Sequence, residues 1–338
     1  MALCVGFLMD PLEGVLVHHD STFALMLECE RRGHQVRCFE QKDLWFDGLE
    51  TSARMRTVAV RKVQGEHFSV LESREAPLSE LDVLFLRKDP PVDVEFLHAT
   101  QLVELSHGDG PFLINSPAGL RDANEKLFAL RYPDLMPPTF VSGDREQLRD
   151  FVERLGVDAI LKPVDGYGGK AIFQTRAGDR NLGSILDVLT NWGRQPIIAQ
   201  AYVPESREGD KRIILLDGDP VGAVLRVPRE DDVRANLAVG GRAVKTVLTD
   251  RDREICARLA PELRWRGLHF VGIDVLGPYL TEVNVTSPTG IAEIDALDGV
   301  SVEAEIIDFV ESKVREREGV WPRSRHGGMS PMDLGVIT

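Results

Sequence analysis

The first forty residues constrain the fold most, because they show a buried strand, a helix and a second strand in succession. The run ALCVGFLM is apolar, and the segment DSTFALMLECERRGH begins with Asp20 and Ser21 at N-cap-like positions, shows helical apolar spacing and ends near Gly33. The strand QVRCFE follows. Two strands joined by a helical crossover lie parallel. We therefore expect an α/β protein that opens with a parallel sheet.

Length and charge narrow the class of protein. The chain has 338 residues, of which 43% are hydrophobic, enough for two or more domains. The formal net charge of −14 argues against a nucleic-acid partner, because neutralising phosphates requires a surplus of Lys and Arg. A local basic pocket for a nucleotide is compatible with this charge.

Targeting signals are weak in this sequence. No apolar run approaches the ~20 residues that span a bilayer. The first residues are apolar, but Asp10 interrupts them and no basic segment precedes them, so we expect neither a signal peptide nor membrane association. Cys4, Cys29, Cys38 and Cys256 form no CxxC pair. Reduced thiols in a cytoplasmic protein are the expectation.

A hairpin near the C-terminus carries the first candidate site. In FVGIDVLGPYLTEVNV, a turn at Gly277–Pro278 places Asp274 across the strand pair from Glu282, and cross-strand neighbours lie ~5 Å apart. Asn284 is two residues from Glu282 and therefore faces the same side. Carboxylate and carboxamide oxygens suit Mg²⁺ bound together with phosphates. The alternative is the polar outer face of an amphipathic hairpin.

Glycine and isolated basic residues supply the second signal. In KPVDGYGGK, which starts at Lys162, the residues Gly166, Gly168 and Gly169 let backbone N–H groups approach an anion. The segment matches neither the P-loop nor the GxGxxG pattern, and a flexible hairpin turn is the alternative. Isolated basic residues could hold phosphate or carboxylate groups, or equally be ordinary surface charges. These residues are Lys126, Lys162, Arg212 and Arg226.

Taken in order, these segments resemble the bacterial glutathione synthetases of the ATP-grasp superfamily. The similar segments are GFLMDP, LFLRKDPP, INSPAGLRDANEKLF, LKPVDGYGG, GDKRIILLDG, NLAVGGR, FVGIDVLG and LTEVNVTSPTGI, which run from residue 4 to about residue 315. The resemblance implies an ATP-grasp fold preceded by a Rossmann-like domain. We expect an N-terminal domain over 1–121, a central subdomain over 122–202, a C-terminal subdomain over 203–318 and a mobile tail over 319–338.

The resemblance also implies a reaction. γ-Glutamylcysteine, glycine and ATP would give glutathione, ADP and phosphate through an acyl phosphate, with Mg²⁺, or Mn²⁺ in its place, bound to the phosphates. The metal ligands would be Asp274, Glu282 and Asn284. The groups acting on the transferring phosphate and the acyl phosphate would be Arg212, Arg226, Gly168 and Gly169. ATP would bind to Lys126, Lys162, Gly166, Tyr167, Gln200, Ala201, Tyr202, Val203 and Lys211.

The implied substrate contacts are spread along the chain. They are Asp10, Arg87, Arg226, Asn236, Gly241, Ser287, Pro288 and Thr289. The polar segment from Val227 to Arg242 matches the long active-site loop of the family and would exclude water from the acyl phosphate. The resemblance further implies a homo-oligomer, a tetramer or a dimer. Two alternatives stay open: an ATP-grasp ligase with another acyl donor or acceptor, and a nucleotide-binding regulatory protein without turnover.

Overall fold

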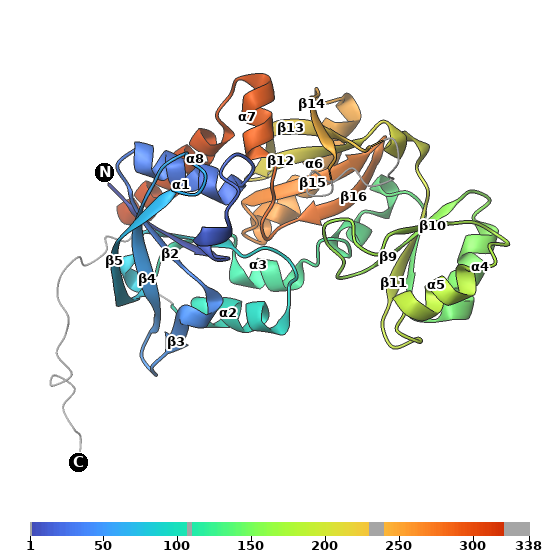
Figure 1. The fold of residues 1–338 in the computed structure, drawn as a ribbon, viewed down its shortest axis with the longest axis horizontal. Coiled ribbons are helices and arrows are strands. Elements are labelled where there is room, and N and C mark those ends of the chain that lie inside the picture. Colours follow the sequence, from blue (N-terminus) through green and yellow to red (C-terminus); the bar gives the residue numbers. More distant parts are fainter. Residues whose placement is uncertain (1, 107–109, 230–239, 321–338) are drawn as a thin grey trace, which may run out of the picture.

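The computed structural model describes residues 2–106, 110–229 and 240–320, and it arranges them around three sheets (Figure 1). The seven-stranded sheet comes from the first part of the chain. A four-stranded sheet forms one end of the elongated molecule, and a five-stranded sheet lies between the two. No helix in the described part of the chain is long and apolar enough to cross a membrane.

The first sheet is mixed, with the expected parallel strands at its centre. Strand β1 (Cys4–Met9) pairs in parallel with β2 (Gln35–Phe39) and with β6 (Val83–Arg87), which pairs in parallel with β7 (Phe112–Ile114). Helix α1 (Ser21–Arg31) makes the first crossover, and the Asp20 carboxylate caps it by accepting from the N–H of Phe23. The antiparallel strands are β3 (Leu44–Phe46), β4 (Thr51–Val60) and β5 (Phe68–Pro77). The remaining helices are α2 (Val94–Glu104) and α3 (Pro117–Asp122).

The four-stranded sheet has a hydrophobic core of its own. Its order is β10 (Phe173–Thr175), β9 (Ala159–Pro163), β11 (Ile197–Ala201) and β8 (Thr139–Ser142). Helices α4 (Arg145–Arg154) and α5 (Leu182–Leu189) bury Leu148, Val152 and Leu186 against it. This unit is therefore packed separately from the rest of the molecule. The domain boundaries at residues 121 and 202 stay predictions, and the three sheets lie on the corresponding sides of them.

The five-stranded sheet carries most of the candidate site. Its order is β14 (Arg242–Lys245), β13 (Asp219–Val227), β12 (Asp210–Leu216), β15 (Phe270–Leu276) and β16 (Tyr279–Asn284). The turn at 277–278 falls where the sequence predicted it, and a second turn at 217–218 joins β12 to β13. Helices α6 (Asp250–Trp265), α7 (Ile291–Asp298) and α8 (Val302–Val320) complete this part. The sequence prediction missed β14, α5 and α7, and the tail from residue 321 lies outside the described residues.

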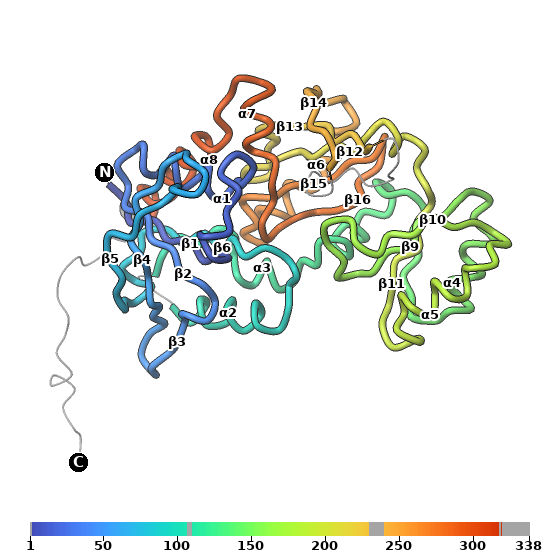
Figure 2. The backbone as a smooth tube through the Cα atoms, in the orientation of Figure 1, coloured from blue at the N-terminus to red at the C-terminus, as the bar shows by residue number. Residues whose placement is uncertain are grey.

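The last helix returns to the first unit of the chain, which the tube in Figure 2 makes easy to follow. Helix α8 buries Val302, Ile306 and Val310 in the same apolar cluster as Val5 and Phe7 of β1. The first sheet thus obtains part of its cover from the far end of the sequence.

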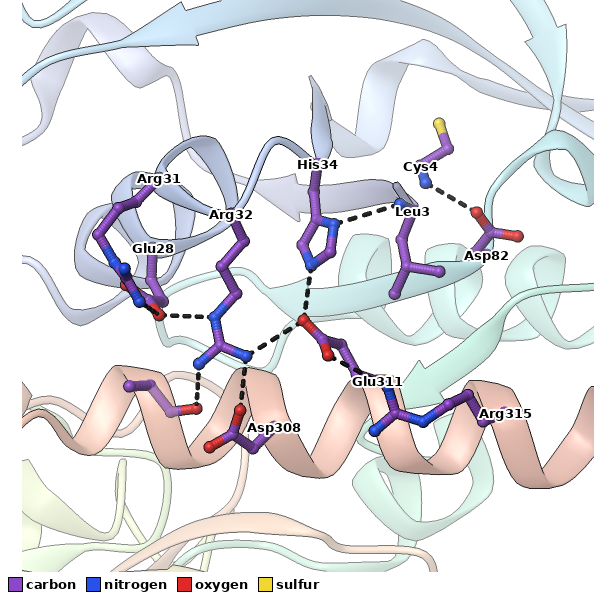
Figure 3. Close-up of polar contacts among 11 residues, drawn as sticks. Leu3, Cys4, Glu28, Arg31, Arg32, His34, Asp82, Asp308, Glu311 and Arg315 are labelled. Carbon is purple, nitrogen blue, oxygen red and sulfur yellow. Dashed lines mark hydrogen bonds and ion pairs between the residues drawn. The ribbon is translucent and has the colours of Figure 1, made fainter. Parts of the chain in front are cut away.

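A polar clasp between α1 and α8 fixes this arrangement (Figure 3). The Arg32 guanidinium donates to the carboxylates of Asp308 at 2.6 Å and Glu311 at 3.1 Å. The buried His34 ring accepts from the Leu3 N–H at Nδ1, so its Nε2 carries the proton and donates to Glu311 at 3.1 Å. Burial opposes ionisation of Glu311, but the hydrogen bonds from Arg32 and His34 outweigh it and hold the pKa of this carboxyl below its usual value.

The clasp makes a prediction about stability and pH. Glu311→Gln should lower the free energy of unfolding at pH 7 by about 2 kcal/mol, because a charge-assisted hydrogen bond is lost. Since the folded pKa of Glu311 lies below its unfolded value near 4.5, this stabilisation is complete above pH 4.5 and disappears as the pH falls through the folded pKa. Urea unfolding of both proteins at pH 7 and at pH 3 measures the difference. Glu316→Gln, on the exposed side of α8, is the control; an equal loss at both pH values would contradict the assignment.

Candidate active site

The hairpin β15–β16 presents its polar side chains on one face, as predicted, and a register shift between Asp274 and Val275 sets their pairing. Asp274 and Glu282 are direct cross-strand partners, and the pair of Gly272 and Asn284 lies two residues further along the strands. Asn284 donates its Nδ2 to Asp274 at 3.3 Å, which leaves its Oδ1 free to accept or to ligate. The three side chains therefore lie together on one face of the sheet.

Two arginines from the neighbouring strands close on Asp274. Arg212 Nε and Nη2 donate to the two oxygens of Asp274 at 2.5 and 3.0 Å, and Arg226 Nη2 lies 3.0 Å from Oδ2. All three side chains are buried. Burial alone would raise the pKa of Asp274, but the charges of Arg212 and Arg226 outweigh it and hold this pKa well below its usual range.

Asp210 is a member of this cluster that the sequence analysis missed. Its carboxylate accepts two bonds from Arg226, at 2.7 and 2.6 Å, and the two residues are cross-strand partners on β12 and β13. Burial raises the pKa of Asp210, although the Arg226 charge opposes this. A signal was present in the sequence, since Asp210 lies two residues before Arg212 on a strand and so shares its face.

The same alternation accounts for Lys211, which the resemblance placed at the nucleotide. Lys211 points to the opposite face of β12, where its Nζ contacts the Asp252 carboxylate at 2.5 Å and the Val247 carbonyl at 3.1 Å. The structure does not bring it to the other candidate residues.

The glycine loop and two lysines face the hairpin across a cavity. Lys126, Lys162, Gly168, Gly169, Asp274 and Glu282 all line it. The Nζ atoms of Lys126 and Lys162 lie 3.7 and 3.8 Å from Glu282 Oε1, beyond hydrogen-bond distance. Burial lowers the pKa of Lys162, with the charge of Glu282 opposing the shift. A buried ammonium aimed at a cavity is suited to a phosphate oxygen.

The loop geometry requires glycine. Gly168 and Gly169 have φ angles of 62° and 75°, a region that other residues seldom adopt. A Cβ atom on Gly166 would lie 2.6 Å from the Pro163 ring. Lys126 Nζ donates to the Gly166 carbonyl, which ties the loop to this lysine. The Lys170 ammonium lies over the Tyr167 ring, 4.5 Å from the ring centroid. The glycines of this loop therefore bring its backbone to the edge of the cavity.

The strand predicted to contact adenine also borders this cavity. Gln200, Ala201, Tyr202 and Val203 all line it. The N–H groups of Ala201 and Tyr202 already donate to the carbonyls of Pro138 and Asp158 at 2.8 Å. These two N–H groups are therefore already engaged within the protein.

The predicted substrate residues divide into two groups. Arg87 is buried and donates to the Thr22 hydroxyl and to the Pro288 carbonyl at 2.9 Å, and its Nη1 has no hydrogen-bond partner within the described part of the chain. Thr289 accepts from Arg212 Nη1 at 3.2 Å, so the 287–290 turn, which includes Ser287, joins Arg87 to the arginine cluster. Asp10 instead accepts from the Asp89 N–H and pairs with Lys88. Gly241 directly precedes β14, and Asn236 lies outside the described residues.

The chemistry of the donor set suits a metal ion bound together with phosphates. Among the described residues, no group of three or more His, Cys, Asp and Glu side chains is arranged to hold a metal by itself. Glu282 and Asn284 offer open oxygens, while both oxygens of Asp274 are engaged by arginine. Mg²⁺ takes one or two carboxylates and completes its shell with substrate phosphates and water. The residues fit such an ion bound together with a nucleotide.

Gly272 makes room for this cluster, which leads to a second prediction. A Cβ atom there would lie 2.8 Å from Pro288 Cβ and 3.1 Å from Arg212 Cδ. Gly272→Ala should lower kcat/KM for ligation by about 100-fold through misplacement of Arg212 and the 287–290 turn, and lower the free energy of unfolding by about 1–3 kcal/mol through overpacking. Steady-state kinetics and urea unfolding measure both. Gly14→Ala is the control, because no atom lies within 4 Å of the added group; equal behaviour of both variants would exclude a steric role for Gly272.

Solved structures share the fold of this chain. The ATP-grasp ligase PsnB, in complex with a minimal precursor, superposes with a TM-score of 0.60 at 18% identity and covers 93% of this chain and 100% of its own. The D-cycloserine synthetase DcsG superposes with a TM-score of 0.63 at 17% identity, covering 91% and 99%. At this level of identity the likeness concerns the fold alone, and the fold is that of the ATP-grasp ligases.

Sequence relatives give the family. The family models for the N-terminal domain and the ATP-grasp domain of prokaryotic glutathione synthetase match residues 3–121 and 125–299. Glutathione synthetase from Gloeobacter violaceus is 50% identical over 91% of this chain and 97% of its own length. The Escherichia coli K12 protein is 42% identical over 93% and 99%. The chain belongs to the prokaryotic glutathione synthetase family of ATP-dependent ligases, as the sequence motifs predicted.

Proposed function

We propose that this chain joins the cysteinyl carboxylate of γ-glutamylcysteine to the amine of glycine at the cost of one ATP. The observation that supports this most directly is the convergence of Asp274, Glu282 and the two lysines on one cavity, with the two arginines bound to Asp274. A carboxylate is a poor acyl donor and has to be activated. Groups that bind phosphates and groups that stabilise an anionic acyl centre therefore belong next to each other.

The chemistry proceeds in two balanced steps. A carboxylate oxygen of the dipeptide attacks the γ-phosphorus of ATP, the bond to the β-phosphate oxygen breaks, and an acyl phosphate and ADP form. The glycine amine then attacks the acyl carbon, loses a proton and expels phosphate, which leaves the new amide bond. Positioning and charge stabilisation supply most of the catalysis in such reactions.

The residues take the following roles in this proposal. Lys126 and Lys162 bind ATP phosphates, and the N–H groups at Gly168 and Gly169 cover the phosphate being transferred. Arg212 and Arg226 stabilise the negative charge of the acyl phosphate and of the tetrahedral intermediate. Asp274, Glu282 and Asn284 would hold Mg²⁺, or Mn²⁺ in its place, which neutralises phosphate charge when bound.

Arg87 and the 287–290 turn form the proposed dipeptide side of the site. The free Nη1 of Arg87 suits a substrate carboxylate, and the segment from Val227 to Arg242 is proposed to exclude water from the acyl phosphate. Most of that segment lies outside the described residues. A homo-oligomeric state and a cytoplasmic location remain part of the proposal, and light scattering of the purified protein measures the former.

One assay tests the reaction. Purified protein is mixed with ATP, Mg²⁺, γ-glutamylcysteine and glycine, and ADP and product mass are followed together. Glutathione formed in step with ADP supports the proposal. ADP that appears only with another donor or acceptor would overturn the substrate assignment, and absence of ADP with every acceptor would favour a nucleotide-binding protein without turnover.

A further inference from the structure

The two carboxylates of the hairpin, Asp274 and Glu282, are cross-strand partners on β15 and β16 but differ in how many hydrogen bonds they accept. Both oxygens of Asp274 accept hydrogen bonds from Arg212, and Oδ2 also accepts from Arg226 and Asn284. Glu282 is about a quarter exposed, and its nearest cations are the two lysine Nζ atoms at 3.7 and 3.8 Å. One carboxylate is fully occupied and the other is open.

An occupied carboxylate cannot ligate a metal without first losing a partner. A carboxylate has about four lone-pair sites, and those of Asp274 are directed at guanidinium and amide protons. A divalent cation placed beside the same oxygens would also be repelled by the two arginine charges, and little water is present there to screen them.

We infer that Arg212 competes with the divalent cation for Asp274, so that this site takes up metal only together with the nucleotide. The inference rests on the proposed role of Asp274 as a metal ligand. It goes further because it names Arg212 as the residue that Asp274 has to release, and because it predicts that metal does not bind before the nucleotide.

The contacts indicate that Arg212, rather than Arg226, is the arginine that competes with the metal for Asp274. Arg226 holds Asp210 with two bonds of its own and loses a single contact when Asp274 turns away. Arg212 loses both bonds of its bidentate pair and keeps the Thr289 carbonyl, which it contacts through Nη1 at 3.2 Å. The released Arg212 is then held by its stem near Gly290 and is free to face an incoming anion.

The charge balance of the site explains why the nucleotide is needed. The charged side chains around the cavity and the cluster include Lys126, Lys162, Lys170, Arg212, Arg226, Asp210, Asp274, Glu282 and Glu125. With five cations against four carboxylates, a divalent ion alone would add to an existing positive excess. The triphosphate reverses this excess and offers Arg212 a new partner, which frees Asp274 at the same time.

Direct metal binding tests the inference without measuring turnover. Mn²⁺ is titrated into the full chain and the free ion is followed by electron paramagnetic resonance, with and without a non-hydrolysable ATP analogue. Wild-type protein should bind Mn²⁺ weakly until the analogue is added. Arg212→Gln should bind Mn²⁺ about tenfold or more tightly in the absence of the analogue, which reduces the coupling between the two ligands.

Two further variants make the result specific. Arg258→Gln removes an arginine whose side chain is about half exposed and should leave Mn²⁺ binding unchanged. The gain in Arg212→Gln should disappear when Asp274→Asn is added to it. If the glutamine variant does not fold, as judged by circular dichroism, Arg212→Lys keeps the charge, cannot fork across both oxygens, and should shift Mn²⁺ binding in the same direction by less.

The outcomes separate this inference from the proposal on which it rests. If Asp274→Asn leaves Mn²⁺ binding with the analogue unchanged, Asp274 is not a metal ligand and both fall. If Asp274→Asn loses Mn²⁺ binding in the presence of the analogue, but neither Arg212 variant binds Mn²⁺ more tightly in its absence, Asp274 stands as a metal ligand. The competition by Arg212 is then overturned.

Discussion

Glu282→Gln should lower the rate of ligation by about 10³-fold while the protein remains folded. The variant keeps the shape of the side chain and removes the charge that faces the cavity. Because Glu282 is partly exposed and makes no close ion pair, its loss should change the free energy of unfolding by less than about 1 kcal/mol. Coupled measurement of ADP release and urea unfolding gives both quantities.

Asp274→Asn changes the other carboxylate of the hairpin and is compared with Glu282→Gln. It should abolish ligation as well, but it should also lower the free energy of unfolding by about 3–5 kcal/mol, because the buried Arg212 and Arg226 charges lose their shared partner. Glu254→Gln, which changes an exposed carboxylate on α6, is the control. Near-normal turnover in both hairpin variants would rule out the metal face.

Lys162→Met should weaken ATP binding by about 100-fold and stabilise the protein. The loss corresponds to one charge-assisted hydrogen bond to phosphate, worth about 1.5–3 kcal/mol. In the unliganded protein the ammonium is buried at a cost, which lowers its pKa, so an apolar side chain of similar length should raise the free energy of unfolding by about 1 kcal/mol. Calorimetric titration with ATP and thermal unfolding measure the two effects.

Lys170→Met supplies the matched control for this experiment. Lys170 belongs to the same loop, but it is exposed and lies over the Tyr167 ring. Its replacement should change ATP affinity by less than about threefold. If Lys162→Met bound ATP as tightly as Lys170→Met, the buried lysine would be a structural residue.

Local turn chemistry made the hairpin and the loop predictable. Gly277–Pro278 fixes the turn, but a two-residue turn alone would pair Asp274 with Thr281. A register shift between Asp274 and Val275, which the turn position does not specify, places Asp274 opposite Glu282, and strand alternation then puts Asn284 on the same side. The residues Gly166, Gly168 and Gly169 indicated a loop whose backbone can approach an anion closely, and Gly168 and Gly169 have positive φ angles in the structure. The family motifs predicted the ATP-grasp fold on the same segments.

Contacts between distant segments were beyond such reasoning. Arg212 and Asp274 are 62 residues apart and meet because β12 pairs with β15, which no local pattern specifies. The missed helix α7 has eight residues and starts directly after the 287–290 turn, where a substrate role had been expected. Strand alternation places Lys211 on the face of β12 opposite to Asp210 and Arg212. The resemblance alone had placed Lys211 at the nucleotide.

The return of α8 to the first sheet has a consequence for synthesis in the cell. Arg32 and Asp308, which join α1 to α8, are 276 residues apart in the chain. The strands made first by the ribosome therefore lack part of their apolar cover until the last helix has emerged. Domains generally fold as units, from the N-terminus onward. Here the N-terminal unit is finished last, so the nascent chain carries exposed apolar surface for most of its elongation.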